Sequence, residues 1–228
     1  MAIVHNSDPI VLVGGSQIGP QELNISPTAA KHFVGVDAGA DHLMAYGIDP
    51  LAVIGDLDSL SDAARAKFAA VLHHIPEQDT VDFEKALRNV EAPLIYAVGF
   101  AGGRLDHTLA VLHVMGRYAE RPVILLSADD ASVVVPRAGL SLTLPIGCRV
   151  SVMPLADARV DASGLVWPII DQEMHPMGFT SPSNAAAQAS VRILAMGPVV
   201  VTLPRSALPA LETAVVHVVL LMIRRPPR

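Results

Sequence analysis

In the stretch LAVIGDLDSL, residues 51–60, an apolar run ends in a glycine and two closely spaced carboxylates. The apolar residues 51–54 predict a buried strand, and Gly55 permits a sharp turn after it. Asp56 and Asp58 follow at the carboxyl end of that strand. Aspartates in this position are ordinarily turn formers, but two of them on one turn can also be aimed at one cation.

Short apolar runs alternate with helix-like segments from residue 8 to about residue 126, which is the pattern of an α/β domain with a mostly parallel sheet. Polar residues gather where these runs end, and open α/β sheets bind ligands at that edge. We therefore predict an α/β domain over residues 1–130. The candidate strands are PIVLVGG, HFVGVDAG, LAVIGDLDS, LHHIPEQD, PLIYAVGF and RPVILLSA.

Three segments between these strands have the spacing of three and four residues that gives a helix one buried stripe. In the third segment, Leu109, Leu112 and Met115 or Gly116 share one face, which we expect to be buried. Serine, threonine and aspartate cap helix starts well. The candidate starts are Ser59 or Ser61, Asp79 or Thr80, and a position near Asp106.

The sequence pattern changes near residue 130, where helical periodicity ends and short β-like runs separated by Pro and Gly begin. This pattern predicts a smaller domain over residues 131–210 that is an antiparallel β-sandwich or barrel. Residues 211–228 form a tail in this division. Its segment AVVHVVLLMIRRPPR fits an interface strand, a surface anchor or a cloning or translation scar, and we favour a scar for roughly the last nine residues.

The composition limits the classes of protein that the chain can belong to. Of its 228 residues, 51% are hydrophobic and 17% are charged, which is typical of a globular protein. The formal charge of −6 argues against generic nucleic-acid binding. Cys148 is the only cysteine and the amino-terminal apolar run is short, so we expect a cytoplasmic protein without disulfides and without a membrane partner.

Acidic residues gather at three places in the first domain, each at the end of a strand or loop. Carboxylates from separate segments form the hard oxygen set that Mg²⁺ uses when it also holds substrate phosphates. Residue types alone leave this interpretation about even with turn formers and helix caps. The residues are Asp56 and Asp58, then Asp79 and Asp82, then Asp106.

The segment GFAGGRLDH, residues 99–107, adds phosphate-binding chemistry to the same edge of the predicted sheet. Its glycines let backbone amides approach a ligand, and Arg104 is a fixed cation suited to phosphate oxygens. The chain contains neither G-x-x-x-x-G-K-[ST] nor G-x-G-x-x-G. The sequence therefore supports neither a P-loop enzyme nor a typical dinucleotide dehydrogenase.

The ordered segments VDAGADHLMAYGIDPLAVIGDLDSL, PEQDTVDFEKAL and GGRLDHTLA resemble the thiamine pyrophosphokinase family, whose motifs are D-G-G-A-N, G-D-x-D-S, Q/K-D-x-T-D and G-G-R-x-D-H. SGLVW and SPSN resemble motifs of that family's β-domain. The resemblance covers roughly residues 8–205. Two departures stand out: residues 37–41 read D-A-G-A-D, and Val81 replaces the usual threonine before Asp82.

The resemblance implies an enzyme that transfers the pyrophosphoryl group of ATP to thiamine, giving thiamine diphosphate and AMP, with Mg²⁺ as its cofactor. It also implies a homodimer in which an ATP-binding catalytic α/β domain is followed by a β-sandwich domain that binds thiamine. A non-catalytic thiamine or nucleotide sensor on the same fold is the alternative. A structural assembly protein whose aspartates are only turn formers is a third possibility.

The resemblance also assigns roles to individual residues. The Mg²⁺ ligands that it implies are Asp56, Asp58 and Asp82, and Arg104 and Asp106 complete the catalytic set. The implied nucleotide-binding residues are Asp37, Gly39, Asp79, Gly102, Gly103, Arg104 and His107. The implied thiamine-binding residues are Trp167, Ser183 and Asn184. Either Asp106 or Asp82 would accept the proton of the thiamine hydroxyl or orient that hydroxyl.

Overall fold

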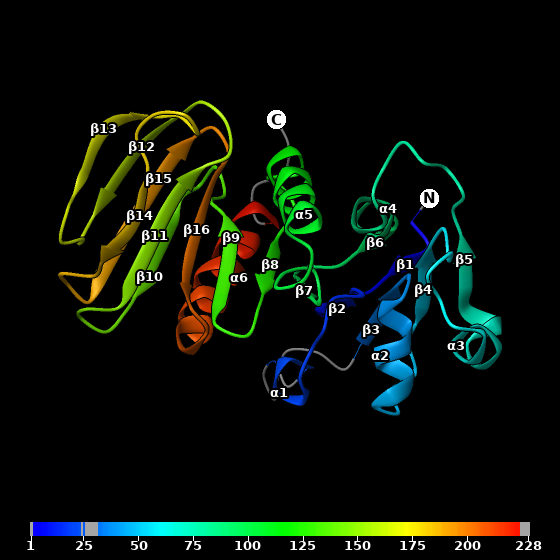
Figure 1. Ribbon diagram of the computed structural model, residues 1–228. Coiled ribbons are helices and arrows are strands. Elements are labelled where there is room, and N and C mark those ends of the chain that lie inside the picture. The colour runs from blue at the N-terminus through cyan, green and yellow to red at the C-terminus, as the bar shows by residue number, and fades with distance from the viewer. Residues whose placement is uncertain (1, 24, 26–31, 224–228) are drawn as a thin grey trace. The chain divides into compact units, whose positions relative to one another are not determined.

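The computed structural model describes residues 2–23, 25 and 32–223. Within it the chain forms two compact units (Figure 1). The first unit comprises Met1–Val114 and Ile124–Ala128, and the second comprises Met115–Val123 and Asp129–Arg228.

The first unit is built on a parallel sheet. Its strands lie in the order β8-β7-β2-β3-β4-β5, and β7, β2, β3, β4 and β5 pair in parallel. Because β3 and β7 lie on opposite sides of β2, the strand order reverses at β2, and this reversal opens a binding crevice in α/β sheets. The strands are β2 (Ile10–Val13), β3 (His32–Val36), β4 (Ala52–Gly55), β5 (Leu72–His74), β7 (Ile95–Val98) and β8 (Val123–Leu126).

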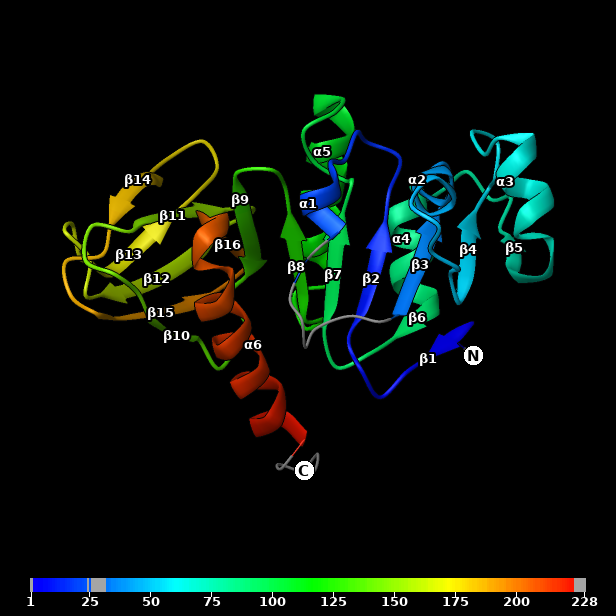
Figure 2. The ribbon, with the colours of Figure 1, turned by 90° about the horizontal axis from the view of Figure 1, so that it is seen from below.

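Helices cover both faces of this sheet, which explains why every residue of β2, β4 and β7 is buried. Figures 1 and 2 both show α2 and α4 on opposite sides of β3 and β4. Two short strands, β1 (Val4–His5) and β6 (Val90–Glu91), pair separately in parallel. The helices are α1 (Pro20–Leu23), α2 (Gly39–Ala45), α3 (Asp62–Lys67), the 3₁₀ turn η1 (Ala69–Val71), α4 (Asp82–Asn89) and α5 (Leu105–Arg117).

The predicted helix starts are confirmed for α3 and corrected for α4. Ser61 caps α3, since its Oγ accepts a hydrogen bond of 3.2 Å from the backbone N–H of Ala64. Helix α4 has Val81 at its N-cap and no side-chain cap, because valine has no polar side-chain atom. The hydroxyl of Thr80 donates to Glu77. Neither Asp79 nor Thr80 caps that helix.

The buried face of α5 also differs from the expected one. Leu109 is 57% exposed, while Val111, Val114 and Met115 are buried. These three residues have the spacing of three and four that defines a helical stripe. The buried stripe therefore includes Met115, as expected, but Val111 and Val114 take the places predicted for Leu109 and Leu112.

The second unit contains a four-stranded antiparallel sheet in the order β10-β15-β12-β13 and four further antiparallel strands in the order β14-β11-β16-β9. Buried and exposed residues alternate along β10 and β12, as in sheets with one face in a core. The strands are β9 (Asp130–Val134), β10 (Leu140–Thr143), β11 (Arg149–Pro154), β12 (Ala158–Ser163), β13 (Ile169–Met174), β14 (Ser181–Ala185), β15 (Ser190–Met196) and β16 (Val199–Pro204). The predicted mixed α/β fold with a separate antiparallel sheet is confirmed.

The carboxyl-terminal segment differs from the expected tail. A 3₁₀ turn, η2 (Arg205–Ala207), leads into helix α6 (Leu208–Ile223), so the segment is neither a strand nor separate from the second unit. The helix buries the stripe Leu211, Ala214, Val215 and Val218. Residues 224–228 of the predicted scar lie outside the described residues. No helix in the described part of the chain combines the length and apolarity needed to cross a membrane.

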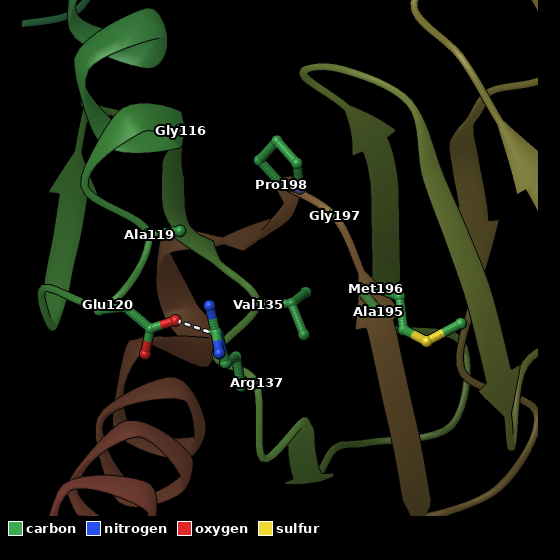
Figure 3. Close-up of a pocket in the computed structure, with 9 residues that line it drawn as sticks. All are labelled: Gly116, Ala119, Glu120, Val135, Arg137, Ala195, Met196, Gly197 and Pro198. Carbon is green, nitrogen blue, oxygen red and sulfur yellow. Dashed lines mark ion pairs between the residues drawn. The ribbon is translucent and has the colours of Figure 1, made fainter.

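A pocket of about 520 Å³ lies in the second unit, lined by residues from 116–120, 135–137 and 195–198 (Figure 3). Glu120 and Arg137 form an ion pair of 2.6 Å at its wall. None of the site residues predicted from the sequence lines this pocket.

Candidate active site

Three aspartates converge at the carboxyl edge of the parallel sheet. Asp37 follows β3, while Asp56 and Asp58 follow β4. Each offers a carboxylate oxygen, and these oxygens lie within 4.8 Å of one another. Asp82, the first residue of α4, joins them because its Oδ1 accepts a hydrogen bond of 3.1 Å from the backbone N–H of Asp56. We call these four residues the acidic cluster.

The backbone of the acidic cluster is strained at two non-glycine residues. Asp37 has a φ of 48° and Leu57 a φ of 62°, a left-handed conformation that side chains disfavour. Leu57 is only 2% exposed and packs with Leu60 and Phe68 in an apolar cluster. Burial of Leu57 thus holds the turn that carries Asp56 and Asp58, and strain of this kind gathers at functional sites.

Two glycines allow the segments of the site to come close together. A Cβ atom at Gly55 would lie 3.1 Å from the Cβ of Asp37 and 3.2 Å from Oδ1 of Asp82. A Cβ atom at Gly39 would lie 1.7 Å from the carbonyl oxygen of Val13. Gly39, predicted to bind nucleotide, therefore has a clear packing role: it lets the start of α2 contact the end of β2.

A buried lysine that the sequence analysis missed lies inside the site. The side chain of Lys85 is 1% exposed, and its Nζ donates to Asp56 Oδ2 at 3.2 Å and to Asp82 Oδ1 at 3.0 Å. Burial by itself lowers the pKa of Lys85, but the hydrogen bonds to Asp82 and Asp56 outweigh it, and the pKa lies above its usual value. The lysine is therefore charged, and it ties α4 to the turn after β4.

Asp56 receives further hydrogen bonds that hold it in the charged form. Burial would raise its pKa, but the hydrogen bonds from Lys85, from the backbone N–H of Asp58 and from Gln78 lower it below the ordinary value. The Gln78 amide donates to Asp56 Oδ2 at 3.2 Å. On the other side of the turn, the hydroxyl of Ser59 donates to Asp58 Oδ1 at 2.8 Å.

Asp37 differs from Asp56 because one of its oxygens has no partner. Its Oδ1 is buried and forms no hydrogen bond within the described part of the chain. Burial raises the pKa of Asp37, and the charges of Asp82, Asp56 and Asp58 raise it further. A buried, unpartnered carboxylate oxygen beside two other carboxylates is a donor set that fits Mg²⁺.

The position of Asp37 predicts that its removal stabilises the metal-free protein. In the folded state the pKa of Asp37 lies above the ordinary 3.8. The protonated side chain therefore stabilises the folded state fully below pH 3.8, and this stabilisation is lost as the pH rises through the folded pKa. At pH 7 the Asp37→Asn variant should therefore unfold about 2–4 °C above the wild type in EDTA, and this difference should shrink towards pH 4.

Calorimetry in EDTA across this pH range measures the effect. Asp49→Asn is the matched control, because Asp49 lies on the surface in an ion pair of 3.6 Å with Lys67, and exposed pairs contribute little. An Asp37→Asn variant that unfolds below the wild type at pH 7 would contradict the prediction.

The segment with Arg104 and Asp106 forms a separate, exposed pair. Arg104 donates from Nε to Asp106 Oδ1 at 3.1 Å and from Nη2 to Asp106 Oδ2 at 2.6 Å. The hydrogen bond from Arg104 lowers the pKa of Asp106 to about 2. The hydrogen bonds found for these two side chains join them to each other and to the backbone of exposed His107, and not to the acidic cluster.

The two neighbouring glycines place this segment beside the end of β2. A Cβ atom at Gly103 would lie 2.7 Å from Oγ of Ser16, and Gly102 has a φ of 85°. Ser16 also donates its backbone N–H to the carbonyl of Gly99 at 2.9 Å. The glycine-rich segment therefore lies where the strand order of the sheet reverses.

The remaining predicted residues occupy loops and the second unit. Asp79 is exposed, and Glu77 accepts hydrogen bonds from the backbone of Asp79 and Thr80. In the second unit Trp167 is 63% exposed and Asn184 is 1% exposed. Ser183 is exposed beside Asn184 on β14.

Comparison with known proteins adds to this geometry. A family model described as "Thiamin pyrophosphokinase, catalytic domain" matches residues 27–126. A curated relative, Thiamine pyrophosphokinase 1 of Arabidopsis thaliana, is 26% identical over 164 residues, which cover 63% of this chain and 61% of the relative. These similarities indicate the thiamin pyrophosphokinase family.

A second relative and a solved structure are also similar to this chain. Thiamine pyrophosphokinase of Bacillus subtilis is 33% identical over 90 residues, 36% of this chain and 42% of that protein. The solved structure of thiamin pyrophosphokinase from Candida albicans matches the fold with a TM-score of 0.74 at 14% identity, covering 88% of this chain and 92% of that one. The alignment with the Arabidopsis relative spans about three fifths of the length of that relative (61%).

The structure explains what replaces the thiamine pyrophosphokinase motifs at two positions. Asp41 stands where the family motif has asparagine, and it accepts hydrogen bonds from the backbone N–H and the hydroxyl of Ser61. It therefore connects α2 to the cap of α3. Val81 stands where threonine is usual, and it is a 43% exposed N-cap without a hydroxyl to cap α4.

Proposed function

We propose that the chain transfers the β,γ-pyrophosphoryl group of ATP to the hydroxyethyl oxygen of thiamine, giving thiamine diphosphate and AMP. The observation that carries this proposal is the convergence of Asp37, Asp56 and Asp58 at the ligand-binding edge of the parallel sheet. Similarity to thiamin pyrophosphokinases supports the choice of substrates. The oxygen of thiamine forms a bond to the β-phosphorus, and the bond from that phosphorus to the oxygen shared with the α-phosphate breaks.

The residues proposed to hold Mg²⁺ are Asp56 and Asp58, with Asp82 as the third ligand expected from the sequence. Asp37 joins this set, because its unpartnered oxygen lies among the same carboxylates. When bound, Mg²⁺ neutralises charge on the phosphate oxygens. Lys85 holds Asp56 and Asp82 in place through its two ion pairs.

The glycine-rich segment is proposed to bind the phosphates of ATP through hydrogen bonds. Arg104 is exposed, and its guanidinium would donate to phosphate oxygens after leaving Asp106. The backbone amides of Gly102 and Gly103 would donate there too. Asp106, once Arg104 has left it, and Asp82 are the two candidates for the residue that accepts the hydroxyl proton or orients the hydroxyl.

The second unit is proposed to bind thiamine through the indole of Trp167 and the hydroxyl of Ser183. An exposed aromatic face suits a flat heteroaromatic cation. We also propose a homodimer, as the family resemblance implies, and a location in the cytoplasm. The single cysteine, Cys148, is compatible with a reducing compartment.

The proposed reaction is tested by identifying the nucleotide that is formed from ATP. Incubated with MgATP and thiamine, the purified protein should release AMP and thiamine diphosphate in equal amounts, and chromatography of both products measures this. Omitting thiamine, or adding EDTA, should abolish AMP release. Formation of ADP and thiamine monophosphate would instead indicate an ordinary kinase, and tight binding of thiamine without AMP would indicate a sensor.

A further inference from the structure

The amide of Asn184 is buried and fully occupied. Its Nδ2 donates to the carbonyl oxygen of Trp167 at 2.7 Å and to Oγ of Ser181 at 3.3 Å. Its Oδ1 accepts from the backbone N–H of Trp167 at 3.2 Å and from that of Ala185 at 2.9 Å. An amide side chain has two N–H donors and two acceptor sites, so every hydrogen bond that Asn184 can make is used within the protein.

Two of these bonds hold Trp167 by both ends of its backbone. The residues before Trp167 are fixed as well: the N–H of Val166 donates to the carbonyl of Ala185 at 2.8 Å, and Leu165 forms a β-bridge with Ala186. Leu165 is also buried, at 3% exposure. The main chain that carries Trp167 is therefore anchored to the end of β14 up to the tryptophan itself.

In contrast to its anchored backbone, the side chain of Trp167 lies at the surface. The residue is 63% exposed, although tryptophan is normally one of the most buried residues on average. A fixed backbone under an exposed ring presents a flat aromatic face with little ordering cost on binding. Ser183, next to Asn184 on β14, is exposed as well, because successive residues of a strand point to opposite faces.

We propose that Asn184 is a positioning residue, which presents the indole of Trp167 to a flat heteroaromatic cation without touching that ligand itself. This changes the role expected for Asn184 from the sequence, where it was a thiamine-binding residue. The choice of thiamine as the cation rests on the proposed function. The fixation of Trp167 by Asn184 does not, since it follows from contacts within the second unit alone.

Fluorescence tests the fixation directly, because Trp167 is the only tryptophan of the chain. In the Asn184→Ala variant without ligand, the fluorescence anisotropy of Trp167 should be lower than in the wild type. The quenching constant for acrylamide should also differ from the wild-type value. Gln188→Ala removes an exposed amide from the same unit and should leave both signals as in the wild type. A folded Asn184→Ala protein with wild-type anisotropy and quenching would overturn the proposal.

Kinetics test the presentation of the ring to the ligand. For Asn184→Ala we expect the KM for thiamine to rise about tenfold, with the KM for ATP and kcat within about twofold of the wild type. A loss confined to kcat would overturn the positioning role. If neither the wild type nor any variant forms AMP, the proposed function is wrong. The anisotropy result still tests whether Asn184 fixes Trp167.

A measurement on the wild-type protein covers the case in which Asn184→Ala does not fold. In nuclear magnetic resonance spectra, addition of thiamine should shift the indole N–H of Trp167 and leave the side-chain NH₂ signals of Asn184 nearly unmoved. Those NH₂ protons should also exchange slowly with water, since both are bonded inside the protein. Rapid exchange, or a shift of the Asn184 signals larger than that of Trp167, would overturn the proposal.

Discussion

The Asp58→Asn variant is expected to lose about two orders of magnitude or more in kcat for AMP formation. Asp58 is exposed, and its carboxylate receives one hydrogen bond of 2.8 Å from the hydroxyl of Ser59. The change removes a negative charge from the acidic cluster without leaving a buried group unpaired. The folded structure should therefore survive, and the loss should reflect weaker binding of the cation and its phosphates.

Steady-state assays at several Mg²⁺ concentrations measure this effect, and thermal unfolding checks that the variant is folded. Asp62→Asn is the matched control, because Asp62 is an exposed aspartate in the first turn of α3, outside the acidic cluster. It should keep near-normal turnover. Near-normal turnover of the Asp58→Asn variant would remove Asp58 from the mechanism.

The Lys85→Met variant is expected to lose about 3–5 kcal/mol of unfolding free energy in EDTA. The loss arises because Asp56 and Asp82 would keep their charges near the end of β4 without the cation that now pairs with both. Mg²⁺ should restore part of the lost stability, since a divalent ion binding the acidic cluster supplies the missing positive charge. Denaturant unfolding with and without Mg²⁺ measures both effects.

A matched control separates the buried lysine from lysines in general. Lys67→Met removes a lysine from α3 whose side chain is 39% exposed, and it should change stability by less than about 1 kcal/mol. Lys85→Arg should fall between the wild type and Lys85→Met, because it keeps the charge but enlarges a fully buried side chain. Equal stability of Lys85→Met and the wild type in EDTA would contradict the structural role.

The parts of the site that follow from local sequence could be predicted. An apolar run that ends in G-D-L-D places two aspartates on one turn, and the structure brings Asp56 and Asp58 together there. The glycine-rich segment was expected at the same edge of the sheet, and Gly103 lies against Ser16 at the end of β2. Their roles as metal and phosphate ligands stay predictions.

The parts that depend on contacts between distant segments could not be predicted. Lys85 sits in α4 beside buried Ala86 and Leu87, and the signal for it was a lysine three residues after Asp82, which puts both side chains on one face of the helix. Whether such a lysine is buried depends on what faces it, in this case Asp56, 29 residues away. Asp37 likewise joins the cluster only because β3 pairs with β4.

The carboxyl-terminal segment shows the same limit for the fold. Its run of apolar residues has no polar alternation, so the sequence does not distinguish a strand from a buried helix by periodicity. The structure has helix α6 there, with a stripe from Leu211 to Val218 buried in the second unit. Tertiary packing, and not local preference, decides the conformation of such a segment.

The division of the chain into units bears on how the protein can be engineered. Residues 115–123 belong to the second unit although they precede residues 124–128, which return to the first. A gene cut near residue 130 would deprive the carboxyl-terminal fragment of Glu120, the partner of Arg137. A chimaera that takes the second unit from a homologous protein must therefore also take residues 115–123 from it. These residues are inserted before residues 124–128, so a single fusion point is not enough.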